Sequence, residues 1–163
     1  MIIKPEPLTQ ASFLPFGDVL EAQADHSELI NCGNTQKFAD LASIVTGEEG
    51  KVQLSIYRSK PIELPFRIKI LERHPLGSQA FYPLHGRPFP VVVALPGESP
   101  GPAEIRAFIS NGRQGININA GVWHHYQLSL GQESDYLVID RYGNGGNFEE
   151  CRISGDVLLN VPP

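Results

Sequence analysis

The stretch Phe66-Arg67-Ile68-Lys69-Ile70-Leu71-Glu72-Arg73-His74 alternates apolar and polar side chains, as a strand with one buried face does. By this alternation, Glu72 and His74 face the same way as Phe66, Ile68 and Ile70. A carboxylate and an imidazole on a core-facing row cost roughly several kcal/mol for each charge that stays unpaired. We therefore expect Glu72 and His74 to bind a partner at the end of this strand.

The composition predicts one globular domain, residues 1–163, built mainly from short strands. Hydrophobic residues make up 41% of the 163 residues and charged residues 19%, which is typical of a folded domain. The chain also contains 16 glycines and 14 prolines. Such frequent turn residues disfavour long helices and favour strands joined by turns.

The charge pattern argues against nucleic acid and membrane partners. The formal net charge is -5, and no run of Lys or Arg forms a basic stripe. No apolar stretch approaches the roughly 18 residues that a membrane-spanning helix needs. We expect a cytoplasmic protein. Its two cysteines, Cys32 and Cys151, have no metal-binding spacing and are predicted to be inert buried thiols.

The order of predicted elements favours an all-β fold. Thr9 can cap a short helix, and one or two such helices are expected in all. The predicted strands cover residues 54–58, 66–74, 79–84, 91–95, 105–109, 115–128 and 136–141. The run at 91–95 is apolar throughout, which predicts a strand buried on both faces. Without helical crossovers, these strands predict an antiparallel β-sandwich or barrel.

The spacing after Glu72 resembles the first cupin motif. In that motif His-x-His, a Glu five residues later and a closing Gly place metal ligands on adjacent strands. Here Glu72 and His74 occupy the His-x-His positions, Gln79 the Glu position and Gly86 the closing Gly. The resemblance implies a cupin-like sandwich or barrel with its site in the interior.

A second segment, residues 119–125, resembles the second cupin motif. Gly121 provides its turn, and His124 occupies the position of the fourth ligand. If His124 faces inward with Val122, Tyr126 and Leu128, then strand alternation turns His125 to the other side with Trp123. Only one of the two histidines then belongs to the site.

Four residues form the candidate metal site that these motifs imply: Glu72, His74, Gln79 and His124. Imidazole and carboxylate suit a divalent cation such as Zn, Ni, Mn or Fe(II), whereas the neutral amide of Gln79 is a weak ligand. The site therefore holds either a divalent metal, with Ni or Zn as candidates, or none. For His74 alone, the alternative is a hydrogen-bonded structural histidine.

Three further residues are candidates for substrate binding. Arg58 shares strand parity with Leu54 and Ile56, so an inward-facing Arg58 can clamp a carboxylate; a surface ion pair is the alternative. Asp140 can orient a histidine or an arginine, or can simply cap a turn. Arg73 alternates away from His74 but ends its strand, and it is kept as a second anion contact.

Several blocks of the chain resemble the ureidoglycolate lyase family, also called ureidoglycolate hydrolase, of purine (allantoin) catabolism. The blocks that carry the resemblance are residues 71–81 with Pro83, 91–95, 106–112 with Gln114-Gly115, 122–125, 139–141 and 16–19. The resemblance implies cleavage of (S)-ureidoglycolate to glyoxylate and urea by a carbon–nitrogen lyase of the amidine-lyase type, acting as a homodimer.

The residues suit that reaction. We expect His124 or His74 to act as the base, and the other histidine or Glu72 to deliver a proton to urea. Arg58 would bind the substrate carboxylate, and Gln79 the ureido group. Two other classes remain open: another small-molecule cupin enzyme that depends on a metal, such as an isomerase or dioxygenase, and a non-catalytic ligand-binding cupin.

Overall fold

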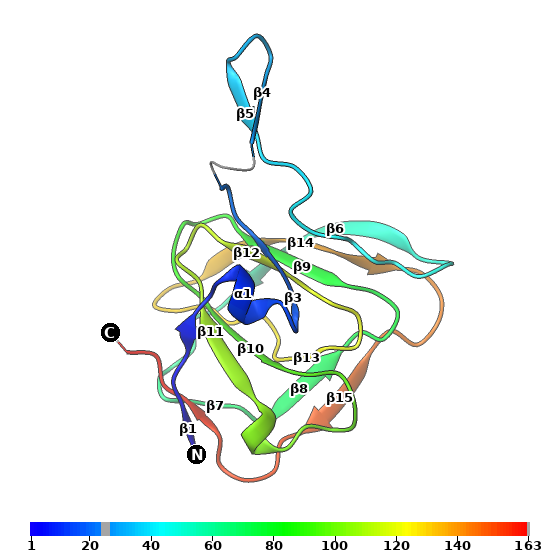
Figure 1. The fold of residues 1–163 in the computed structure, drawn as a ribbon. Helices are drawn as coiled ribbons and strands as arrows, with labels where there is room; N and C mark the ends of the chain where they lie inside the picture. The colour runs from blue at the N-terminus through cyan, green and yellow to red at the C-terminus, as the bar shows by residue number, and fades with distance from the viewer. Residues whose placement is uncertain (24–26, 163) are drawn as a thin grey trace.

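The computed structural model describes residues 1–23 and 27–162, and these residues form stacked β-sheets with very little helix (Figure 1). In chain order the elements are β1 (Ile2–Ile3), β2 (Glu6–Pro7), α1 (Gln10–Phe13), β3 (Gly17–Leu20), β4 (Glu28–Ile30), β5 (Thr35–Lys37), β6 (Lys51–Ser59), β7 (Phe66–Arg67), β8 (Ile70–Arg73), β9 (Gln79–Pro83), β10 (Pro90–Ala94), the 3₁₀ turn η2 (Pro102–Glu104), β11 (Arg106–Ile109), β12 (Gly115–Ile118), β13 (Trp123–His124), β14 (Ser134–Tyr142), β15 (Glu149–Arg152) and β16 (Leu158–Leu159).

Two larger sheets make up the sandwich. One has six strands in the order β15-β8-β13-β10-β11-β2, and the other has five in the order β3-β12-β9-β14-β6. Apart from β2 beside β11, neighbouring strands in both sheets are antiparallel. The predicted all-β antiparallel sandwich is therefore confirmed. Among the described residues, no helix is long and apolar enough to cross a membrane.

The core has two parts, and β10 separates them. Val91 and Val93 pack into the cluster between the two larger sheets, whereas Val92 and Ala94 pack into a second cluster on the other side. That second cluster is covered by the small sheet β1-β16-β7. The predicted strand with two buried faces is thus confirmed, because β10 has packed layers on both sides.

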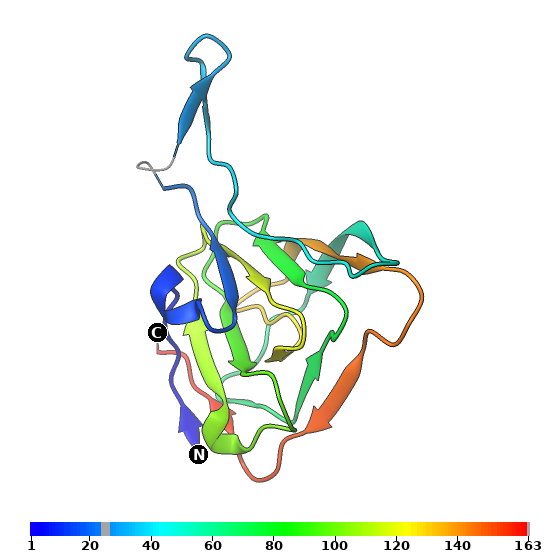
Figure 2. The ribbon, with the colours of Figure 1, turned by 45° about the vertical axis from the view of Figure 1, so that its right-hand side comes forward.

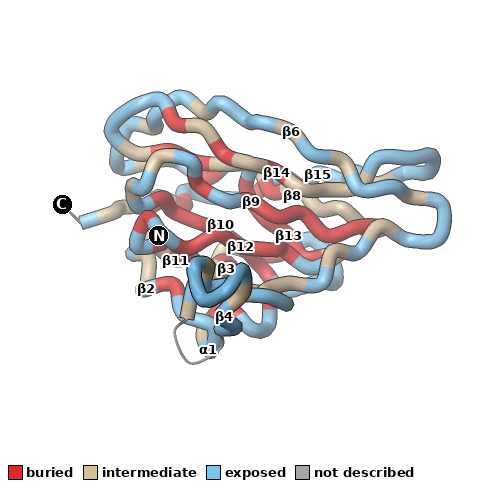
Figure 3. Tube along the Cα trace, turned by 90° about the horizontal axis from the view of Figure 1, so that it is seen from above, coloured by how far each residue is buried: buried red, intermediate tan, exposed pale blue. Residues whose placement is uncertain are grey.

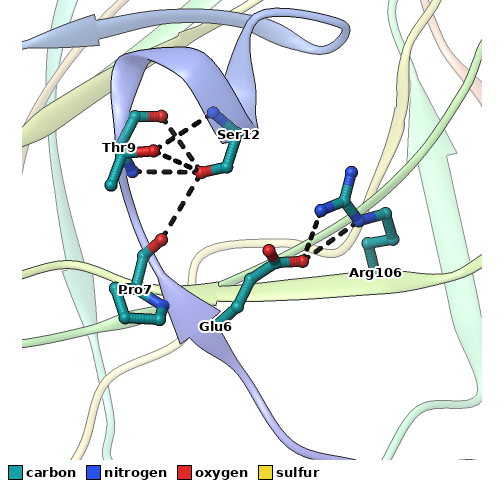
Figure 4. Close-up of polar contacts among 5 residues, drawn as sticks. All are labelled: Glu6, Pro7, Thr9, Ser12 and Arg106. Carbon is teal, nitrogen blue, oxygen red and sulfur yellow. Dashed lines mark hydrogen bonds and ion pairs between the residues drawn. The ribbon is translucent and has the colours of Figure 1, made fainter.

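The short helix α1 begins where the sequence predicts. Thr9 accepts a hydrogen bond from the Ser12 backbone N–H at 3.1 Å, and the two residues form a reciprocal capping box (Figure 4). The same view shows the ion pair between Glu6 and Arg106, which joins β2 to β11. Phe13 is fully buried and meets Phe108 edge-on, so the helix anchors one end of the core.

The predicted single strand 66–74 is wrong, because the chain changes sheets within it. β7 pairs with β16 in the small sheet, whereas β8 lies in the six-stranded sheet. Ile68 and Leu71 both pack into the second cluster although they are three residues apart, so the alternation shifts phase between them. The row that leads to the site therefore begins only at β8.

The hairpin β4–β5 projects from the body of the molecule in both side views (Figures 1 and 2). Cys32 lies exposed in its turn, where the backbone has a φ of 57°. The prediction that both cysteines are buried is therefore wrong for Cys32 and confirmed for Cys151.

Candidate active site

Three side chains from two segments meet inside the sandwich. His124 on β13 lies directly opposite Glu72 on β8, and His74 follows β8 with the same parity as Glu72. One potential ligand atom from each residue lies within 4.8 Å of the others. The two imidazole rings are 5.2 Å apart between centroids. The structure thus brings together the two motif segments that the sequence analysis paired.

The hydrogen bonds of the two histidines leave one nitrogen of each free. His74 Nδ1 lies 2.8 Å from the backbone carbonyl of Asn147, and His124 Nδ1 lies 3.1 Å from the carbonyl of His125. A carbonyl only accepts, so each Nδ1 donates, and each neutral ring keeps its lone pair on Nε2. Both Nε2 atoms are buried without a hydrogen-bond partner. Each lone pair is therefore available for a proton or a metal ion.

Burial sets the protonation of this cluster. Desolvation, followed by the neighbouring His74, lowers the pKa of His124 to about 3. The same burial raises the pKa of Glu72, although His74 partly opposes this. His124 is thus neutral at physiological pH, and Glu72 takes up a proton more readily than a carboxyl in water.

Strand alternation separates the two neighbouring histidines. Val122 packs in the cluster between the larger sheets, and Trp123 packs in the second cluster. His125 lies outside the site and meets Phe66 edge-on at 5.4 Å. The predicted inward row does not extend further, because β13 ends at His124: Tyr126 is 46% exposed and Leu128 packs in the second cluster.

The five-stranded sheet supplies the facing wall. Gln79 on β9 lies beside Asp140 on β14, and its Nε2 donates to Asp140 Oδ2 at 3.2 Å. Gln79 Oε1 and Asp140 Oδ1 are buried without a partner. The wall therefore offers two free hydrogen-bond acceptors. Glu72, His74 and His124 are thus brought together as predicted, whereas Gln79 lies on the facing wall with its Nε2 bound to Asp140 and its Oε1 free, so its place in the predicted set of four stays a prediction.

Tyr57 on β6 is a member of this wall that the sequence analysis did not select. Its pKa is raised by burial first, and then by the negative charges of Asp140 and Glu72. Its ring packs edge-on against Phe81 at 6.1 Å. The signal was the alternation of β6, in which Tyr57 shares a face with the polar Gln53 and Ser55.

Arg58 points away from the site, so its predicted inward orientation is wrong. Its side chain is 66% exposed and forms a two-pronged ion pair with Asp135, with Nε–Oδ1 at 2.8 Å and Nη2–Oδ2 at 2.9 Å. Parity with Leu54 and Ile56 was correct, but that row is the outer one: Leu54 is 66% and Ile56 55% exposed. The alternative, a surface ion pair, is the one observed.

Arg73 also faces away, as its alternation with His74 indicates. Its guanidinium lies 4.4 Å from the centre of the Trp123 ring and is paired with Glu149. Its Nη1 donates to the carbonyl of Gly97 at 2.7 Å. These contacts occupy Arg73, so the prediction of a second anion contact is wrong for this structure. Among the described residues, no Lys or Arg forms a hydrogen bond or ion pair with Glu72, His74 or His124.

The donor set fits a divalent cation. Two buried Nε2 lone pairs without partners and one carboxylate are the groups that bind Zn, Ni, Mn or Fe(II). The Nδ1 bonds to backbone carbonyls fix the ring orientation and leave Nε2 as the nitrogen without a partner, while His124 Nδ1 lies 3.9 Å from Glu72 Oε1.

Comparisons with known proteins identify the family of this chain. The sequence profile of the family described as Ureidoglycolate lyase matches residues 1–160. The chain belongs to the ureidoglycolate lyase family. It is 47% identical over 162 residues to a ureidoglycolate lyase of Pseudomonas paraeruginosa, covering 99% of this chain and 96% of the relative. It is 47% identical over 159 residues to that of Pseudomonas entomophila, covering 97% and 95%. For the ureidoglycolate lyase of Stutzerimonas stutzeri the identity is 46% over 159 residues, covering 97% and 94%.

Proposed function

We propose that this chain cleaves (S)-ureidoglycolate to glyoxylate and urea. The observation that carries the proposal is the pairing of two unlike walls: imidazole lone pairs and a carboxylate on one sheet, and free amide and carboxylate acceptors on the facing sheet. Ureidoglycolate has two ends that complement these walls, a hydroxy acid for the first and a ureido group for the second. Membership of the ureidoglycolate lyase family supports this substrate.

The substrate lies across the interior in this proposal. The ureido N–H groups donate to Gln79 Oε1 and Asp140 Oδ1, because buried acceptors without partners favour a ligand that brings donors. The hydroxyl and carboxylate then face Glu72, His74 and His124. The ureido end and the acid end are thus held by different sheets.

The reaction needs one base and one acid. Ureidoglycolate is a carbinolamide, so removal of the hydroxyl proton lets the carbonyl form while the C–N bond breaks and its electron pair leaves with the ureido nitrogen. His74 or His124 takes that proton on its free Nε2. Glu72, whose pKa burial raises, protonates the departing nitrogen, because the other neutral histidine has its one proton bound to a backbone carbonyl. No water is consumed, so the enzyme is a carbon–nitrogen lyase of the amidine-lyase type.

The substrate carboxylate needs a positive partner that neither Arg58 nor Arg73 provides. We propose, as the alternative to direct proton transfer by these groups, that Glu72, His74 and His124 hold a divalent cation next to it, in which case they serve as ligands rather than as base and acid. When bound, such a cation offsets the charge of the carboxylate and polarises the hydroxyl oxygen. The chain's own residues still bind the ureido end and exclude water.

The proposed function is tested with purified protein and (S)-ureidoglycolate, with glyoxylate and urea each followed against time. We expect both products to form in equal amounts and much faster than without protein. If ureidoglycolate disappears no faster than by its spontaneous decay, the lyase proposal is wrong.

We also propose that the chain works as a homodimer, as the family resemblance implies, and that the outer face of β6 contributes to the contact. β6 is an edge strand that is coloured as exposed or intermediate in Figure 3. Its outward Val52, Leu54 and Ile56 are each more than half exposed. A long apolar edge row favours association with another sheet or chain. A cytoplasmic location and a place in allantoin breakdown stay predictions from the sequence and the family.

A double variant tests this contact. Replacing Leu54 and Ile56 with Asp places two charges on the outer row, and we expect it to convert the dimer to a monomer because each charge would lose its water at the interface. Light scattering after size-exclusion chromatography measures the molar mass, which we expect to fall from that of two chains to that of one. Leu95→Asp is the control, since Leu95 is equally exposed but lies outside β6. A wild-type monomer, or a variant that stays dimeric, contradicts the proposal.

A further inference from the structure

The strand β6 has its polar side chains turned inward. Gln53 and Ser55 are half-buried, while the alternating Val52, Leu54 and Ile56 are exposed. This is the reverse of an ordinary edge strand, whose apolar row faces the core. A polar inner row on a strand of this sandwich needs hydrogen-bonding partners inside it.

The strand register places this row next to the ureido wall. Asp140 lies directly opposite Gln53, and Tyr57 lies opposite Tyr136, four residues along β6. Phe81 on β9 pairs with Val138, between these two positions. The Tyr57 ring is 39% exposed and packs edge-on against Phe81 at 6.1 Å. Its hydroxyl lies within hydrogen-bonding reach of Asp140, and the charge of Glu72 on the facing sheet also acts on it.

We propose that Tyr57 is a third contact for the ureido end of the substrate, donating its hydroxyl hydrogen to the ureido carbonyl oxygen. This inference rests on the proposed function. Gln79 Oε1 and Asp140 Oδ1 are acceptors and match the ureido N–H groups. The ureido carbonyl oxygen needs a donor, and the phenol of Tyr57 supplies it once a ureido N–H takes the place of the phenol at Asp140. The three groups together complement every part of the ureido group.

The contact has a consequence for the rate as well as for binding. When the C–N bond breaks, the electron pair that leaves with the ureido group is shared between its nitrogen and its carbonyl oxygen. A hydrogen bond to that oxygen therefore strengthens as the bond breaks, which is how such donors assist catalysis. We expect Tyr57 to lower the barrier to C–N cleavage and to select for ureido substrates.

The test uses Tyr57→Phe, which keeps the ring on Phe81 and removes only the hydroxyl. Tyr82→Phe is the matched control, because Tyr82 lies on the neighbouring β9 with its side chain on the outer face. The probe is N-carbamoylglycine, which has the ureido and acid ends but no hydroxyl, so it cannot release urea. Its affinity is measured by calorimetry for each protein, and thermal unfolding reports whether each variant is folded.

We expect Tyr57→Phe to bind N-carbamoylglycine about tenfold more weakly than wild type and to lose about tenfold in kcat. Tyr82→Phe should match wild type in both. Equal affinity of wild type and Tyr57→Phe for the probe, including no binding by either, would overturn the inference even if lyase activity is present. Binding that depends on Tyr57, in a protein that does not accelerate ureidoglycolate decay, would support this contact and disprove only the lyase proposal.

Discussion

Replacing His124 with alanine is expected to lower kcat for ureidoglycolate cleavage by about 10² or more. His124 is fully buried and has an Nε2 lone pair without a hydrogen-bond partner. Whether that lone pair takes the hydroxyl proton or holds a cation, alanine removes it and leaves an empty space in its place. Steady-state kinetics with glyoxylate detection measures the effect, and thermal unfolding shows whether the fold survives the lost ring.

The matched control for this variant is His125→Gln. His125 is the next residue, is also buried, and has its pKa lowered to about 4 by burial, but its ring packs on Phe66 outside the site. We expect this control to keep kcat within a few-fold of wild type. Near-normal turnover by the His124 variant would exclude His124 from both roles.

Removing divalent metal is expected to lower the rate by about 10² or more, with recovery on addition of one kind of cation. The physical reason is charge: the substrate carboxylate enters an interior that already contains Glu72 and Asp140, while Arg58 and Arg73 are paired elsewhere. Dialysis against a chelator, elemental analysis and titration with Zn, Ni, Mn and Fe(II) measure the effect.

A substitution at Glu72 separates metal binding from the general effect of a chelator. Glu72→Gln keeps the shape of the side chain but removes the carboxylate ligand, so we expect less metal per chain and a lower rate that excess cation partly restores. Glu150→Gln is the control, because Glu150 faces Glu72 in the register of β15 and β8 but is exposed. Full activity of wild type without bound metal would disprove the cation proposal.

Sequence patterns predicted the parts of this fold that depend on local chemistry. The apolar run of β10 and the Thr9 cap of α1 correspond to the observed elements, because burial and capping leave direct traces in the residue types. The pairing of Glu72 and His74 with His124 came from motif spacing rather than from periodicity. Strand alternation then separated His124 from His125.

The misplacement of Arg58 and Tyr57 arises because strand alternation does not show which face of a strand is buried. Alternation shows that Leu54, Ile56 and Arg58 share one face of β6, but which face is inside depends on the neighbouring sheets. The usual assumption that the apolar row is buried placed Arg58 in the site and left Tyr57 out of it.

The prediction of a single strand at residues 66–74 was wrong for a different reason. Its chain passes from the small sheet to the six-stranded sheet near Lys69, and the phase shift at that crossing leaves no mark in the residue types. Only the positions of Val157 and Leu159, far along the chain, explain why Ile68 packs where it does.

The two rows of β6 also limit how the length of this chain can vary. Inserting or deleting one residue within Lys51–Ser59 would reverse the two faces of the part of β6 that shifts register, turning its outward apolar residues inward and its inward polar residues outward. Such a change would disrupt both the substrate-binding wall on the inner face and the proposed subunit contact on the outer face. Homologous chains should therefore place their insertions and deletions in the turns around Gly50 and Pro61 and keep the nine residues of β6 at constant length.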